Sequence, residues 1–210
     1  MNCWSSRWEL VQELSLIPEH KYKNKEKRIM KAWEKLSSTQ VVHNKWVKLR
    51  KDTVKLPNGV ILDDYYLFEK NDVALIVAVD EQNCIILKKE YRYPVNEVLY
   101  ELPGGMIEEG EDPLETAKRE LLEETGNVSD DWKQLMCGYD YPTKDTNCVY
   151  IFLAKNVKKA ADQKLDISEN IEMEKVPLQE AVKMCRNNQI KVNGSISGIL
   201  LTELALKEKI

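Results

Sequence analysis

The sequence predicts an α/β fold in which a mixed β-sheet lies between helices. Short β-rich runs alternate with helical patterns from about residue 45 onward. The run Val73–Val79 is apolar at successive positions, which is typical of a strand covered on both faces. With 43% hydrophobic and 31% charged residues, the 210-residue chain is sufficient for one packed core.

The first part of the chain has helical periodicity. Apolar residues recur at spacings of three and four over residues 5–36, with a break at Pro18. We therefore predict a helical N-terminal extension over residues 1–40 and a main domain over residues 41–210. Residues 1–55 carry 13 Lys and Arg against 6 Asp and Glu. Because Lys-rich helical faces are usually solvated, we do not expect a nucleic-acid partner.

The main domain is predicted to open with a β-hairpin within residues 41–69. Two β-rich runs, 45–56 and 60–68, flank the turn sequence Pro57-Asn58-Gly59. The elements expected after it are strands at 73–79 and 84–90, a loop at 93–110, a helix at 113–125, strands at 134–138, 148–154 and 171–176, and helices at 178–187 and 195–207.

The helix at 113–125 has the clearest boundaries. Asp112 can cap its N-terminus, Pro113 suits the first helical position, and Glu115 has the spacing of a capping box. Gly126 is expected to end the helix.

Composition excludes several kinds of chemistry. The five cysteines are scattered without a Cys-x-x-Cys pair, which argues against a disulfide framework and against a structural zinc site. The two histidines, His20 and His43, make a Ser-His-Asp triad a poor candidate. Since the longest apolar run is seven residues and the chain starts without a signal-peptide apolar block, we expect a cytoplasmic protein without a membrane partner.

Three carboxylates share one face of the helix at 113–125. Glu120, Glu123 and Glu124 are spaced i, i+3 and i+4, and like charges at these spacings repel one another. Clustered carboxylates without thiolate or imidazole suit Mg²⁺ or Mn²⁺. The upstream pair Gly104-Gly105 lets backbone approach a ligand closely, so a main-chain carbonyl there can complete the coordination. Arg119 is expected to orient a carboxylate through a bidentate pair.

Together these residues form the pattern Gly105-x5-Glu111-x7-Arg119-Glu120-Leu121-x-Glu123-Glu124-x-Gly126, which resembles the Nudix box. All the glycine, arginine and glutamate positions are filled; the departure is Asn127, where the family prefers a hydrophobic residue. The resemblance implies an α/β/α sandwich, dependence on Mg²⁺, and hydrolysis of nucleoside diphosphates linked to another moiety.

Further segments resemble the ADP-ribose (ADP-sugar) pyrophosphatase branch of that family. The similarity covers roughly residues 44–208. Gly104 stands where this branch often carries alanine, and Pro142 stands where it carries a distinguishing proline. The other similar segments are Lys45–Leu49, Pro57-Asn58-Gly59, Glu90-Tyr91-Arg92, Glu101–Gly105 and Glu169–Glu172.

The resemblance implies a set of site residues. The metal ligands are Glu120, Glu123, Glu124 and the carbonyl of Gly104. Arg92 pairs with a phosphate, Glu101 contacts the substrate, and Trp46 stacks on adenine from the other subunit of a homodimer. The alternatives are a surface charge for Arg92, a solvated loop acid for Glu101 and a packing aromatic for Trp46.

A general base is also needed, and the resemblance points to a loop in the last third of the chain. Glu169 is the best match there, with Glu111 and Glu172 as alternatives, so the implied catalytic residues are Glu169, Glu120 and Glu124. The implied reaction is hydrolysis of ADP-ribose to AMP and ribose 5-phosphate. Another nucleotide sugar, an oxidised nucleoside diphosphate, or a non-catalytic nucleotide-sensing module are the alternatives.

Overall fold

The computed structural model describes residues 30–165 and 170–207. Most of the predicted N-terminal helical extension lies outside these ranges. Within them the helix prediction is wrong, because strand β1 spans Glu34–His43 and so includes the last residues of the predicted extension, which ends at residue 40. Pairing of β1 with β2 along its whole length overrides the local spacing of apolar residues, and Trp33 packs edge-on against Tyr65 instead of within a helix. No helix in these ranges is long and apolar enough to cross a bilayer.

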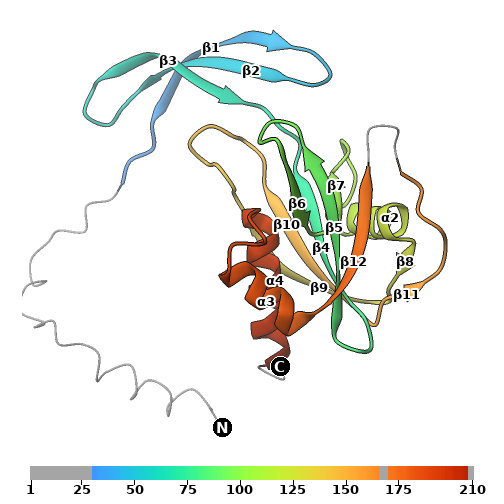
Figure 1. Cartoon of the computed structure of the whole chain (residues 1–210). Coiled ribbons are helices and arrows are strands. Elements are labelled where there is room, and N and C mark those ends of the chain that lie inside the picture. Colours follow the sequence, from blue (N-terminus) through green and yellow to red (C-terminus); the bar gives the residue numbers. More distant parts are fainter. Residues whose placement is uncertain (1–29, 166–169, 208–210) are drawn as a thin grey trace, which may run out of the picture.

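A three-stranded antiparallel sheet precedes the main body (Figure 1). Its strands are β1, β2 (Lys48–Lys55) and β3 (Ile61–Phe68), so the predicted hairpin is present as β2–β3 and β1 adds a strand. Main-chain hydrogen bonds tie β3 to the segment after β9: Phe68 N–H donates to the Lys144 carbonyl at 2.8 Å and Thr146 N–H donates to the Phe68 carbonyl at 3.1 Å.

The main sheet is mixed, as predicted. β4 and β10 are parallel and the other neighbours along the sheet are antiparallel. Its order is β12 (Ile171–Pro177), β5 (Cys84–Arg92), β4 (Val73–Val79), β10 (Val149–Lys155) and β9 (Asp131–Gly138). A separate small ladder joins β8 (Asn127–Val128) to β11 (Lys158–Lys159).

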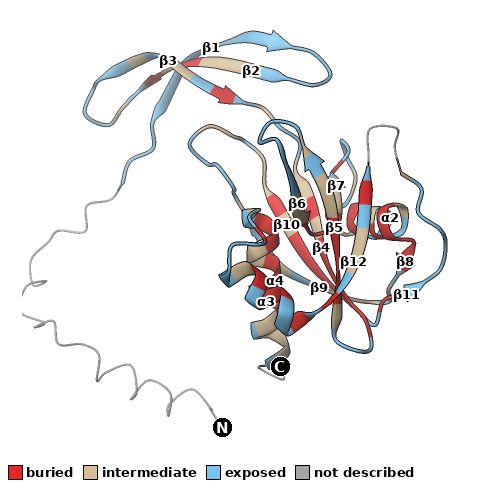
Figure 2. Ribbon diagram, in the orientation of Figure 1, coloured by how far each residue is buried: buried red, intermediate tan, exposed pale blue. Residues whose placement is uncertain are grey.

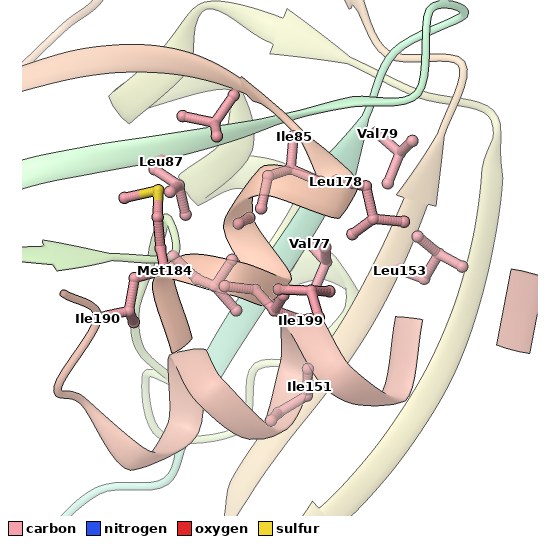
Figure 3. Close-up of a cluster of buried hydrophobic side chains, with 14 of the residues drawn as sticks. Val77, Val79, Ile85, Leu87, Ile151, Leu153, Leu178, Met184, Ile190 and Ile199 are labelled. Carbon is pink, nitrogen blue, oxygen red and sulfur yellow. The ribbon is translucent and has the colours of Figure 1, made fainter. Parts of the chain in front are cut away.

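Helices cover both faces of the main sheet, which confirms the predicted sandwich. Alternate residues of the central strands face opposite sides, because side chains in a strand have a period of two. On one side they pack against α3 (Leu178–Arg186) and α4 (Asn193–Lys207), and Figure 3 shows Val77 and Ile151 beside Ile199. On the other side, Ile76 lies in a cluster with residues of α2 (Pro113–Thr125). The buried strands lie between these layers in Figure 2.

Both ends of α2 are where the sequence places them. The Asp112 carboxylate accepts hydrogen bonds from the N–H groups of Leu114 and Glu115 at 2.9 and 3.3 Å. Gly126 takes a left-handed conformation with φ of 66° and its N–H donates to Leu122. Glu115 pairs with Lys118 on the surface. The caps fix the rotation of α2, and hence the direction of its acidic face.

The segment 93–110 contains two strands that the sequence did not predict. β4 and β5 pair at Val79 and Ile85 beside their connecting turn. Further along, β5 pairs with β6 (Glu97–Glu101) and β4 pairs with β7 (Gly104–Met106). The prolines interrupt this segment without preventing the pairing, since Pro94 and Pro103 lie outside both short strands. The segment thereby enters the sheet and carries its polar residues to the end of α2.

Candidate active site

A cavity of about 540 Å³ lies where β4, β5, β6, β7 and α2 meet. Its volume is within the range of small-molecule sites. Of the residues implied by the sequence, Arg92, Glu101, Gly104, Glu120 and Glu124 line it, and Glu123 does not. The other lining residues are Asn71, Val73, Leu75, Lys88, Glu90, Leu102, Gly105, Met106, Glu108 and Arg119.

The glycine pair allows backbone and carboxylate to come together. Gly104 has φ of 149°, and a Cβ there would lie 2.2 Å from the carbonyl oxygen of Ala74, so this position requires glycine. A Cβ on Gly105 would lie 2.3 Å from Oε1 of Glu120. The Glu120 carboxylate therefore rests against the Gly105 backbone.

Glu124 is the most deeply buried carboxylate of the acidic face, with 2% of its surface exposed. Its Oε1 accepts a hydrogen bond from Lys88 Nζ at 2.5 Å, and its Oε2 accepts one from the Gly104 N–H at 2.7 Å. Burial raises the pKa of Glu124, while the Lys88 ammonium acts in the opposite direction. Sequence reasoning missed Lys88, because a lysine in a β-strand has no signal of its own.

Arg119 holds three carboxylates together. Its Nε and Nη2 donate to the two oxygens of Glu111, each at 3.1 Å, which is the bidentate pair expected for this arginine. Nη1 donates to Glu120 at 2.7 Å and to Glu123 at 3.2 Å. The hydrogen bonds from Arg119 lower the pKa of Glu111 to about 2. A carboxylate with so low a pKa is a weak proton acceptor, which disfavours Glu111 as the general base.

Arg92 and Glu101 form a second bidentate pair in the cavity lining. Nε and Nη2 of Arg92 donate to the two oxygens of Glu101 at 2.8 and 2.7 Å, and Nη1 donates to Glu90 at 2.7 Å. Glu101 is buried, with 8% of its surface exposed, so its alternative interpretation as a solvated loop acid is wrong. The hydrogen bonds that Arg92 donates to Glu101 raise the pKa of Arg92, which remains a cation.

The cavity has a net negative charge. Five carboxylates line it against three cations, which leaves a balance of −2. A diphosphate would be repelled by this surface unless divalent cations came with it. The oxygen donors fit Mg²⁺ or Mn²⁺. In the described ranges, however, no group of three or more His, Cys, Asp or Glu is arranged to hold a metal ion, and Lys88 and Arg119 pair with the acidic face instead.

The remaining implied residues lie apart from the cavity or outside the described ranges. Trp46 is in the β1–β2 turn with 79% of its surface exposed, and Lys45 Nζ lies 4.4 Å from its ring centroid. It is therefore not a core aromatic of this chain. Glu172 is exposed on β12 and outside the cavity lining. Glu169 lies outside the described residues.

The fold and the acidic, glycine-lined cavity define a Nudix-type domain. The NUDIX domain family matches residues 69–193, and the nucleoside diphosphate sugar hydrolase N-terminal domain matches residues 33–68. The chain belongs to the NUDIX family. A crystal structure of an ADP compounds hydrolase shares the fold with a TM-score of 0.77 at 20% identity, covering 89% of this chain and 98% of that one.

The curated relatives include pyrophosphatases and an activator of another enzyme. An ADP-ribose pyrophosphatase of Bacillus subtilis (strain 168) is 30% identical over 156 residues, covering 74% of this chain and 84% of the relative. A GDP-mannose pyrophosphatase of Yersinia enterocolitica is 27% identical, covering 73% and 86%. A methanol dehydrogenase activator of Bacillus methanolicus is 29% identical over 177 residues, covering 83% and 95%.

Proposed function

We propose that this protein is a Mg²⁺-dependent hydrolase that splits ADP-ribose into AMP and ribose 5-phosphate. The observation that carries the proposal is the gathering of Glu120, Glu124, Gly104 and Arg92 around one cavity of suitable size. The names of the pyrophosphatase relatives support the substrate class. Mn²⁺ is the expected substitute for Mg²⁺, because both prefer oxygen ligands.

In this proposal Glu120, Glu123, Glu124 and the Gly104 carbonyl hold the divalent cations. When bound, such ions neutralise diphosphate charge and lower the pKa of a coordinated water. Arg92 lies on the cavity wall, where its guanidinium can donate to a phosphate oxygen while Glu101 fixes its orientation. Glu101 also contacts the substrate in this proposal. Arg119 positions Glu120 and Glu123.

The reaction needs a proton acceptor for the attacking water. Water adds at phosphorus, the bridging P–O bond breaks, and the bond's electrons leave with the departing phosphate. We keep Glu169 as the proposed base. The alternatives are weaker, since Glu111 is paired with Arg119 and Glu172 lies outside the cavity lining.

We further propose that the active form is a homodimer in which Trp46 of one subunit stacks on the adenine bound by the other. Trp46 is exposed in the β1–β2 turn of the N-terminal sheet, outside the cavity lining of its own chain. That sheet also exposes large apolar side chains, which a subunit interface would cover. They are Leu36, Val41, Val42, Ile61, Tyr66 and Phe68.

The experiment is a product assay over ADP-ribose, other nucleotide sugars, oxidised nucleoside diphosphates and dinucleotides, with Mg²⁺. Chromatography should show AMP and ribose 5-phosphate, formed fastest from ADP-ribose. A second candidate function, a nucleotide-sensing module that acts on a partner, is favoured by the activator among the relatives. Binding of ADP-ribose without turnover would support that module and contradict the hydrolase.

A further inference from the structure

Lys88 is a buried cation inside the cavity. It has 4% of its surface exposed, although lysine is almost never buried without a partner. In the β5–β6 ladder it lies opposite Glu101. Its Nζ lies 2.5 Å from Oε1 of Glu124 and 3.4 Å from Oε2 of Glu90. Its neighbour Lys89 pairs with Glu174 at 2.6 Å, on a more exposed site and outside the cavity lining.

Lys88 is fixed at this place. If Lys88 moved away from Glu124, a buried ammonium and a buried carboxylate would both lose a partner, which costs more free energy than keeping the pair. The short chain of contacts from Lys88 through Glu124 to the Gly104 N–H also ties β5 to α2 and β7. A divalent cation that binds the acidic face would therefore coordinate Glu124 while Lys88 is still paired with it.

We propose that Lys88 is a permanent counter-ion that shares Glu124 with the catalytic metal and limits how many divalent cations the site binds. Lys88 takes Oε1 of Glu124, while Oε2 accepts a hydrogen bond from the Gly104 N–H and keeps one further lone pair for a cation. The lining has a net charge of −2 with Lys88 and −3 without it. One divalent cation therefore neutralises the lining when Lys88 is present. This inference rests on the proposed metal-dependent function.

The test measures Mn²⁺ binding without substrate, by electron paramagnetic resonance and by calorimetry. Lys88→Met keeps the volume of the side chain and removes its charge, and Lys89→Met is the matched control on the adjacent residue. Lys88→Met should bind one more Mn²⁺ per chain than the wild type, or bind Mn²⁺ at least about tenfold more tightly, because a nearby like charge is gone. Lys89→Met should match the wild type. Equal number and affinity in all three proteins would overturn the proposal.

A second measurement uses the wild-type chain, so it does not depend on the folding of Lys88→Met. The Lys88 ammonium should give a protected ¹H–¹⁵N side-chain signal, assigned through Lys88→Arg, and that signal should persist at saturating Mg²⁺. Its loss to rapid exchange on adding Mg²⁺ would contradict a permanent counter-ion. Hydrolysis of ADP-ribose is scored separately. If the wild type does not hydrolyse ADP-ribose but Lys88→Met still differs from it in Mn²⁺ binding, the proposed function is refuted and the role of Lys88 stands.

Discussion

The guanidinium of Arg92 and the carboxylate of Glu101 face each other in a bidentate pair, with N–O distances of 2.8 and 2.7 Å. Both side chains line the cavity. The pairing with Glu101 holds the Arg92 guanidinium in one orientation toward a ligand instead of leaving it free to rotate.

Arg92→Lys should therefore lower kcat/KM for ADP-ribose by about 10- to 100-fold, because a lysine ammonium cannot reproduce two parallel hydrogen bonds and hold a phosphate as well. Steady-state kinetics with Mg²⁺ measures this. Lys70→Arg, which changes a lysine that pairs with Asp145 on the surface, is the control and should leave kcat/KM unchanged. Wild-type kinetics in Arg92→Lys would place the phosphate elsewhere.

Glu124→Gln should reduce turnover by orders of magnitude, because it removes a proposed metal ligand. It should also lower the free energy of unfolding, by about 3–5 kcal/mol, since Lys88 loses its buried partner. Urea denaturation measures the second effect. The double variant Lys88→Met/Glu124→Gln should regain much of the stability while remaining inactive, and near-normal activity in either variant would refute the metal assignment.

Trp46→Ala should raise KM with little change in kcat or stability. The ring is exposed in the described chain, so its removal creates no cavity in the core. Kinetics and thermal melting distinguish this from a packing role, which would show as a lower Tm with an unchanged KM. Sedimentation of the variant checks that the proposed dimer persists.

Gly104→Ala should be strongly destabilising, by more than about 2 kcal/mol, because the added Cβ meets the Ala74 carbonyl in a backbone conformation that disfavours side chains. Gly59→Ala is the matched control. Gly59 also has a positive φ, of 88°, but nothing lies within 4 Å of its added Cβ. A smaller loss is expected there, about 1 kcal/mol. Equal losses of unfolding free energy would show that the contact with Ala74 is not what requires glycine.

The Arg119–Glu111 pair predicts a pH dependence of stability. The pKa of Glu111 is lowered from 4.5 to about 2 by the hydrogen bonds from Arg119. A lowered pKa in the folded state stabilises the fold above pH 4.5, and this contribution is lost as the pH falls from 4.5 toward 2. The difference in unfolding free energy between wild type and Glu111→Gln should therefore shrink across this range. A difference independent of pH would contradict the pairing.

The elements with strong local signals could be predicted from the sequence, and those set by distant pairing could not. The caps at Asp112 and Gly126 fix α2 from local chemistry, and the apolar run Val73–Val79 marks a strand. In contrast, β1 has a helical spacing at its start but takes its conformation from pairing with β2. β6 and β7 are short and depend on β5 and β4 for their partners.

The same division holds for the site. The acidic face and the glycine pair lie close together along the chain, so the order of residues alone reveals their pattern. Lys88 and Glu90 reach the cavity through strand register, which one sequence does not reveal. The exposure of Trp46 also depends on where a turn ends in space.

The fastening of β3 to residues 144–146 uses main-chain donors and acceptors. Backbone bonds of this kind are indifferent to which side chains the segment carries. The main-chain part of this anchor would consequently survive sequence divergence at residues 144–146, even where an exchange removed their side-chain contacts with Tyr66 and Lys70.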